Sequence, residues 1–436
     1  MDRSASAKVT AFLDRNNLAL NLWAVFAAFT AYFCMYAFRK PFAAGTFEGQ
    51  VDMGGGFQVD YKIVLIIAQV FGYTLSKFAG IKVISEMKPH QRAWALLGMI
   101  GVAEGALVLF ALTPAPYNAF WLFVNGTPLG MIWGLVFGYL EGRRTTEALG
   151  AGLSASYILA SGWVKSLGKW LLLQGVSEFW MPALAGAVFF LPLLLSVWML
   201  KVLPPPSAED VAARTKREPM DGAARSRFFW HFAPGLIALT SLHILMTAYR
   251  DFRDNFAAEI WNALGYGDAP AILGMAEIPV ALGVLAALGL LFLIKDNRMG
   301  LLGVQVVQLF GCALVFSTTF AYRQGVLDPA WWMILVGVGL YLTYVPFGSA
   351  LFDRLIAASG VVANAGFMIY VTDAFGYLGS VFLLLYKNFG QKNLSWLEFF
   401  VDFSYAASGL GMILGLSSLL YFWWRTQDHI IAAKAA

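Results

Sequence analysis

Residues 36–42 read Tyr-Ala-Phe-Arg-Lys-Pro-Phe, and they end a run of about twenty almost wholly apolar residues, 18–38. That run is long enough for a helix that crosses a bilayer. Arg39 and Lys40 then stand side by side between aromatic residues. A charge deep in a membrane is costly, so it usually faces protein or a water-filled cavity. Two interpretations are open: the helix ends at Phe38 and the pair anchors it to lipid headgroups, or the helix continues and holds the pair inside the membrane.

The amino-acid composition is that of a polytopic membrane protein. Of 436 residues, 59% are hydrophobic and 13% are charged, against roughly 25% charged in a soluble domain. The two cysteines, Cys34 and Cys312, lie far apart in apolar runs and indicate small buried side chains without a disulfide or metal site. The net charge of +4 comes from cations spread over the loops, which does not indicate a nucleic-acid partner.

Apolar runs of span length recur along the chain and predict an all-α integral membrane protein with twelve transmembrane helices. The predicted spans are 18–38, 62–84, 93–112, 119–140, 147–173, 180–201, 233–253, 271–294, 299–320, 330–352, 361–386 and 402–424. A proline-rich, basic connection follows the sixth span. We therefore expect three parts, listed in order: an N-terminal six-helix bundle (1–203), a basic linker (204–232) and a C-terminal six-helix bundle (233–436).

The distribution of Lys and Arg predicts the orientation of the chain. With the N-terminus in the cytoplasm, most of the 30 basic residues fall on the cytoplasmic side, and the external connection 113–118 carries no charge. We expect both termini and the linker to be cytoplasmic, with the protein in a plasma membrane such as the inner membrane of a bacterium.

The two halves carry matching polar features. Span 7 ends in Tyr249-Arg250-Asp251, so an arginine beside aromatic residues recurs where span 1 has Arg39. This weak repeat favours two pseudo-symmetric bundles with a central site. Polar side chains also recur at helical spacing inside spans, where lipid offers them no hydrogen-bond partners, so they should face a cavity or another helix. These stripes are Gln69, Tyr73 and Lys77; Tyr157, Ser161 and Lys165; His243, Thr247, Arg250 and Asp254; and Tyr370, Asp373 and Tyr377.

Within the spans, cations outnumber the acids that could reach a central cavity, which implies an anionic ligand. The planar guanidinium group binds phosphate or carboxylate through two parallel hydrogen bonds. The candidate substrate-binding residues are Arg39, Arg250, Lys77, Lys40, Lys165, Tyr36, Tyr249, Tyr73, Tyr344 and Tyr370. The candidates for proton coupling or ion pairing are Asp373, Glu277 and Asp251. Structural alternatives stay open: Lys165 can snorkel to an interface, Asp373 and Glu277 can hold helices together, and His243 fits an ordinary interior histidine.

Several motifs resemble those of the organophosphate:phosphate antiporter branch of the major facilitator superfamily, which includes glycerol-3-phosphate and hexose-phosphate carriers. They are Arg39-Lys40-Pro41-Phe42, Gly72-Tyr73-Thr74-Leu75-Ser76-Lys77-Phe78, Tyr249-Arg250, Tyr344-Val345-Pro346 and Phe375-Gly376-Tyr377-Leu378-Gly379. The resemblance implies the major facilitator fold, with Arg39 and Arg250 binding a phosphoryl group and Lys77 assisting. The chain departs from the branch in span 5, where Lys165 follows one turn after the place of the family's histidine.

These features predict a secondary transporter for a small organic anion, with an organophosphate as the class that the resemblance implies. Two other functions stay open: a proton-coupled carrier of an organic carboxylate, and a membrane sensor that keeps the binding site and signals through a partner. The sequence has no clustered metal ligands, no Gly-rich phosphate loop and no Ser/His/Asp set, so we expect neither an enzyme nor a cofactor. The expected partners are the anion and the lipid bilayer, with the protein a monomer.

Overall fold

The computed structural model describes residues 3–52, 54, 58–212, 222–359, 365–391 and 393–435. The chain divides into two compact units. The first comprises Met1–Arg214 and Asp254–Met275, and the second comprises Thr215–Arg253 and Ala276–Ala436. Residues 213–221 of the predicted linker lie outside the described residues.

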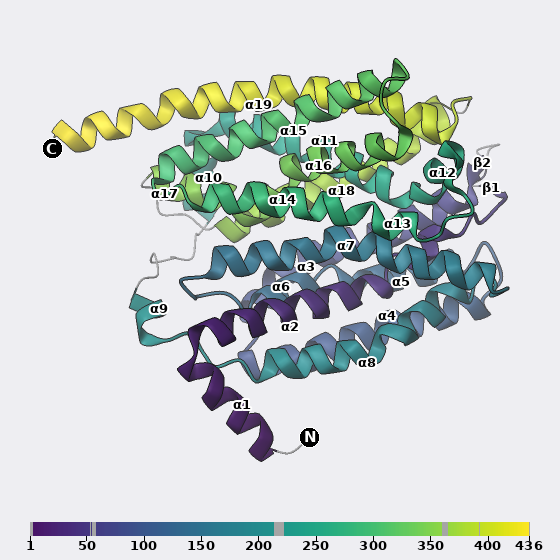
Figure 1. The fold of residues 1–436 in the computed structure, drawn as a ribbon, viewed down its shortest axis with the longest axis horizontal. Coiled ribbons are helices and arrows are strands. Elements are labelled where there is room, and N and C mark those ends of the chain that lie inside the picture. Colours follow the sequence, from purple (N-terminus) through teal and green to yellow (C-terminus); the bar gives the residue numbers. More distant parts are fainter. Residues whose placement is uncertain are drawn as a thin grey trace. The chain divides into compact units, whose positions relative to one another are not determined.

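The first unit is mainly helical, and Figure 1 colours its elements along the sequence. Its elements are α1 (Arg3–Arg15), α2 (Asn17–Ala37), η1 (Pro41–Ala44), β1 (Gln50–Asp52), β2 (Gln58–Asp60), α3 (Tyr61–Glu86), η2 (Pro89–Gln91), α4 (Arg92–Leu112), α5 (Ala119–Leu129), α6 (Ile132–Phe137), α7 (Thr146–Leu173), α8 (Met181–Lys201), α9 (Ala208–Ala212), α12 (Ala257–Trp261), η3 (Asn262–Tyr266) and α13 (Ile272–Met275). The strands β1 and β2 form an antiparallel hairpin with Val51 opposite Val59, an element the apolar pattern did not predict.

The second unit is helical throughout its described part. Its elements are α10 (Gly222–His231), α11 (Ala233–Asn255), α14 (Glu277–Phe292), α15 (Asn297–Arg323), α16 (Pro329–Ser349), α17 (Leu351–Ser359), α18 (Ala365–Gly390) and α19 (Trp396–Ala435). Helix α11 passes from the second unit into the first between Arg253 and Asp254. The segment Asp254–Met275, which the sequence assigned to the C-terminal bundle, therefore belongs to the first unit.

Each predicted span has a helix, or two consecutive helices, at its place in the chain. Span 4 is divided into α5 and α6, and span 8 into α13 and α14. Among the described residues, nine helical segments are long and apolar enough to cross a membrane. Helices α7 and α11 have span length but carry polar and charged side chains along their course. The prediction of an all-α integral membrane protein is thus confirmed.

The end of α2 corrects both interpretations of the Arg39-Lys40 pair. The helix ends at Ala37 with Phe38 as its C-cap, and Pro41, which has no N–H to continue the hydrogen-bond pattern, begins the short helix η1. The helix therefore does not continue through the pair. Yet Arg39 and Lys40 are each only 3% exposed, so they lie inside the protein and do not reach lipid headgroups.

Close helix contacts hold the elements that carry these side chains. A Cβ atom added at Gly126 of α5 would lie 2.2 Å from the carbonyl oxygen of Gln69 in α3. In the second unit, a Cβ atom at Gly311 of α15 would lie 2.4 Å from the carbonyl oxygen of Gly339 in α16. Both distances are far below van der Waals contact, so each pair of helices meets backbone to backbone.

Candidate anion-binding site

Two amide side chains hold the peptide carbonyls at the end of α2. Asn125 donates hydrogen bonds to the carbonyls of Phe38, at 2.9 Å, and Ala103, at 3.0 Å. Gln69 donates to the carbonyl of Arg39 at 3.0 Å and to the side-chain oxygen of Asn125 at 2.8 Å. The last carbonyls of a helix lack intrahelical partners, and the membrane interior offers no water in their place. These amides therefore fix the backbone from which the Arg39 side chain extends.

Tyr73 of α3 brings two of the predicted cations together. The Arg39 guanidinium carbon lies 3.8 Å from the centre of the Tyr73 ring, and the Lys77 ammonium lies 5.5 Å from it. Tyr73 and Lys77 are 1% and 5% exposed. A desolvated cation is attracted to the face of an aromatic ring, so this tyrosine stabilises both charges within the first unit. Tyr36, in the last turn of α2, is also buried, and its ring contacts the Tyr32 ring edge to face.

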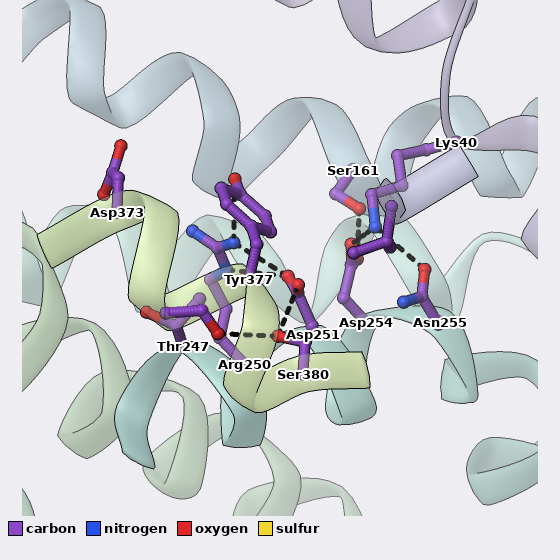
Figure 2. Close-up of polar contacts among 12 residues, drawn as sticks. Lys40, Ser161, Thr247, Arg250, Asp251, Asp254, Asn255, Asp373, Tyr377 and Ser380 are labelled. Atoms are coloured by element: carbon purple, nitrogen blue, oxygen red, sulfur yellow. Dashed lines mark hydrogen bonds and ion pairs between the residues drawn. The ribbon is translucent and has the colours of Figure 1, made fainter. Parts of the chain in front are cut away.

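Lys40 and Lys165 meet at one carboxylate, that of Asp254, also within the first unit. Figure 2 shows Lys40, Ser161 and Asp254 of this cluster. The Lys40 ammonium lies 2.5 Å from one Asp254 oxygen, and the Lys165 ammonium lies 2.6 Å from the other. Ser161, one turn before Lys165 on α7, donates to the same oxygen as Lys165, and Lys40 also donates to the side-chain oxygen of Asn255 at 2.9 Å. Lys165 therefore lies in a buried ion-pair cluster and does not snorkel to an interface.

A second ion pair joins the same segment to α3 within the first unit. The Lys62 ammonium pairs with Glu259 of α12 and donates to the carbonyl of Ala43 at 2.9 Å. Neither Lys62 nor Glu259 was among the site residues predicted from the sequence. Their polarity alone gave no signal, because both residues stand at the edges of apolar runs where charged side chains are common.

The predicted arginine of the second unit, Arg250, is held by residues of α11, α16 and α18. Its Nη2 atom lies 2.7 Å from a carboxylate oxygen of Asp251 and donates to the Tyr377 hydroxyl at 3.2 Å. Ser380 donates to the other Asp251 oxygen at 2.9 Å (Figure 2). The guanidinium carbon also lies 4.3 Å from the centre of the Tyr344 ring. Arg250 thus stacks on a tyrosine of its own unit, as Arg39 does.

Helices α11 and α18 approach closely enough to make these contacts because α18 carries glycines at the interface. A Cβ atom at Gly376 would lie 2.6 Å from the Thr247 hydroxyl, and one at Gly379 would lie 2.6 Å from the Ile244 side chain. The motif that resembled the antiporter branch here has a local physical role: its glycines let α18 pack on α11 and place Tyr377 against Arg250.

His243 and Asp373 form a further pair between the same two helices. The Nε2 atom of His243 lies 3.1 Å from a carboxylate oxygen of Asp373. The imidazole stacks on the Tyr344 ring, with centroids 5.1 Å apart, and contacts Phe347 at 4.6 Å. From the sequence, His243 was interpreted as an interior histidine and Asp373 as a separate candidate for proton coupling. It did not predict that they meet.

Glu277, another candidate for coupling, is paired with an arginine. Its carboxylate accepts a hydrogen bond from Arg253 at 2.9 Å, and Arg253 also donates to the carbonyl of Met333 at 3.2 Å. Arg253 is 4% exposed and Glu277 is 8% exposed. The arrangement is that of an ion pair holding α11, α14 and α16 together.

Two tyrosines predicted to bind the substrate, Tyr249 and Tyr370, do not appear among the described side chains that contact Arg250. Tyr249 is fully buried against α19, where its hydroxyl lies 2.5 Å from that of Ser404 and its ring stacks on Phe400. The aromatic face on which Arg250 stacks is that of Tyr344, and not that of Tyr249, its neighbour in the sequence. Tyr370 belongs to α18, but its side chain lies outside the described part of the structure.

Comparison with known proteins identifies the fold and a family without an assigned function. Residues 41–425 match the model of a family of unknown function, DUF5690. No curated protein matches the chain. Among solved structures, a D-xylose–proton symporter is similar with a TM-score of 0.59 and 13% identity, covering 93% of this chain and 97% of the symporter. A mutant of the nucleoside transporter NupG is similar with a TM-score of 0.57 and 14% identity, covering 92% and 100%. The fold is therefore that of the major facilitator superfamily.

Proposed function

The chain belongs to DUF5690, a family of unknown function, and from its major facilitator fold and its buried cations we propose that it is a secondary transporter of a small organic anion. One observation supports an anionic substrate. In the first unit, four basic side chains of predicted spans or span ends, Arg39, Lys40, Lys77 and Lys165, are each at most 5% exposed. Basic groups at membrane depth are expensive, and they usually mark the path of a substrate or ion.

The proposed site consists of Arg39 with Lys77 in the first unit and Arg250 in the second, each supplying donors to the same anion during the transport cycle. Both guanidinium groups stack on tyrosine rings, which fixes their planes while leaving their N–H groups along the edge. A phosphoryl or carboxylate group accepts two parallel hydrogen bonds from such an edge. The motif resemblance favours an organophosphate over other anions.

Alternating access follows from the fold as part of this proposal. In major facilitator transporters, substrates bind between two repeats that rock about a central site. The similarity to a D-xylose–proton symporter and to a nucleoside transporter supports transport as the activity of this chain. We propose a monomer in a bacterial inner membrane. The distribution of Lys and Arg supports the further proposal that both termini lie in the cytoplasm.

Uptake by the purified protein in proteoliposomes tests the function. Vesicles loaded with inorganic phosphate are offered labelled glycerol 3-phosphate, glucose 6-phosphate, methylphosphonate or succinate. We expect saturable uptake of at least one of these anions, and loss of that uptake in Arg39→Ala. Binding of an anion without uptake would instead identify a membrane sensor, and uptake retained in Arg39→Ala would remove Arg39 from the site.

A further inference from the structure

The pairs between α11 and α18 form a regular series in the second unit. His243 faces Asp373, Thr247 contacts Gly376, and Arg250 contacts Tyr377. From the His243–Asp373 pair to the Asp251–Ser380 pair, a step of eight residues along α11 is matched by seven along α18, so the two helices run in the same direction across this contact. The histidine–aspartate pair therefore lies seven residues before Arg250, which is about 10 Å along the helix axis.

The imidazole of His243 is buried beside the carboxylate of Asp373. The residue is 2% exposed, and its Nδ1 atom has no hydrogen-bond partner among the described residues. Its Nε2 atom meets Asp373, a second group that takes up protons. An arginine in place of the histidine would stay charged throughout, as Arg253 does beside Glu277, whereas imidazole changes its charge between about pH 5 and 8.

Tyr344 links this pair to the arginine. The His243 ring stacks on the Tyr344 ring with an interplanar angle of 17°, and the Arg250 guanidinium carbon lies 4.3 Å from the centre of the same ring. The titratable and charged groups around the pair, among the described residues, are Tyr344 on α16, Asp373 and Tyr377 on α18, and Arg250 with Asp251 on α11 itself.

We propose that His243 and Asp373 form a proton-binding site, and that one proton bound there is carried with each anion. This proposal rests on the proposed transport of an anion and adds its coupling ion. A proton on the pair adds a positive charge near Arg250, so it strengthens binding of the anion. By linkage, the bound anion strengthens binding of the proton by the same factor. Proton and monoanion together carry no net charge.

The proton site itself is tested without any substrate by infrared spectroscopy of the purified full-length protein. Between pH 8 and pH 5, chosen to span the titration range of histidine, wild type should show protonation bands of imidazole or carboxylic acid. The bands that come from the pair should be missing in Asp373→Asn and shifted in His243→Gln, whereas the bands of the other three histidines should remain in both variants. Identical difference spectra for wild type and Asp373→Asn would overturn the site.

Coupling is tested by uptake into proteoliposomes with the membrane potential clamped at zero. If one proton enters with each anion, an external pH one unit below the internal pH should raise the ratio of internal to external anion about tenfold. Asp373→Asn should accumulate no more with the gradient than without it. Asp402→Asn is the matched control, since it removes a carboxylate of the same unit from an exposed pair with Arg323, and it should keep the full effect.

The outcomes separate this proposal from the function on which it rests. Wild-type uptake that ignores the pH gradient would overturn coupling while leaving anion transport standing. Protonation bands in a protein that transports none of the anions would leave the proton site standing and remove the transporter. A gradient effect that persists in Asp373→Asn would show that another group carries the proton.

Discussion

Arg39 and Arg250 each place a guanidinium over a tyrosine ring, and both are proposed to bind the anion. Lysine would keep the charge but lose the planar donor edge and the stacking. We expect Arg39→Lys and Arg250→Lys each to weaken anion binding by about ten- to a hundredfold, the equivalent of one lost charge-assisted hydrogen bond. Calorimetric titration of the purified variants with the transported anion measures this.

The double lysine variant provides the sharper form of that test. Because both arginines are proposed to hold one ligand, their effects should not add, with a coupling energy above about 0.5 kcal/mol. Strict additivity would mean that the two arginines act at separate places. Unchanged affinity in both single variants would remove the pair from the site altogether.

Asp254 is the shared partner of two buried lysines, and removing its charge should destabilise the protein. Asp254→Asn leaves Lys165 with a buried ammonium beside a neutral amide, for which we expect a loss of about 3 kcal/mol. The triple variant Lys40→Met/Lys165→Met/Asp254→Leu should recover part of it, because all three charges of the cluster are then removed. Asp402→Asn, from an exposed pair, should cost less than about 1 kcal/mol. Equal losses of thermal stability in Asp254→Asn and Asp402→Asn would contradict the buried-cluster interpretation.

At the scale of the elements, the contact between α3 and α5 depends on Gly126. Its added Cβ atom would lie 2.2 Å from the Gln69 carbonyl oxygen and 2.9 Å from the Tyr73 nitrogen, so Gly126→Ala must push two backbones apart. We expect a loss of about 1–3 kcal/mol, typical of overpacking. Gly101 on α4 is the matched control, since its Cβ atom would meet nothing within 4 Å. Thermal unfolding in detergent should show Gly101→Ala unchanged or slightly more stable, and the opposite order would refute the close contact.

Helix α9 is attached to the turn before α7 through Asp210. Its carboxylate accepts hydrogen bonds from the backbone N–H groups of Arg144 and Ser207, both at 3.0 Å, and these hold the pKa of Asp210 below its ordinary value of 3.8. A carboxylate with a lowered pKa stabilises the folded form at higher pH. That contribution is lost as the pH falls below 3.8 through the lower folded value.

Cleavage by pepsin, which is active in acid, measures how firmly α9 is attached. At pH 5, Asp210→Asn should be cleaved in residues 204–212 faster than wild type, because the amide holds the two N–H groups less strongly than a carboxylate. At pH 2.5, below the ordinary aspartate pKa of 3.8, the two rates should lie closer together than at pH 5. A rate ratio that is the same at both pH values would show that Asp210 does not hold α9 in place.

For the whole molecule, the orientation in the membrane can be tested at two exposed positions. Ser207 lies in the expected cytoplasmic linker, and Tyr117 lies in the expected external connection and is 76% exposed. Cys34 and Cys312 are buried, so they should not compete for reagent. In intact cells, an impermeant maleimide should label Tyr117→Cys and spare Ser207→Cys until the membrane is permeabilised. The reverse pattern would invert the proposed topology.

Much of the fold could be predicted from the sequence. Apolar runs of the length that a bilayer requires predicted twelve spans, and each run has one helix or two consecutive helices at its place, because that signal depends only on neighbouring residues. Nine helical segments of the described residues are long and apolar enough to cross a membrane. Gly130 and Met131 lie between α5 and α6, and the run 119–140 did not indicate this break because its residues stay apolar across it. The sequence also singled out the stripes on α3, α7, α11 and α18 that carry Tyr73, Lys165, Arg250 and Asp373.

Only the tertiary structure decided which of these side chains meet. Adjacent residues on a helix point about 100° apart, so Tyr249 turns to α19 while Arg250 finds its aromatic partner, Tyr344, almost a hundred residues later. The meeting of Lys40, Lys165 and Asp254 depends on how α2, α7 and the segment from Asp254 onward pack, as does the pairing of His243 with Asp373 across α11 and α18. A sequence shows the spacing of residues along one helix, whereas the partner of a buried charge is set by the register between helices. That register depends on close contacts such as Gly376 against Thr247, which form only when the chain is folded.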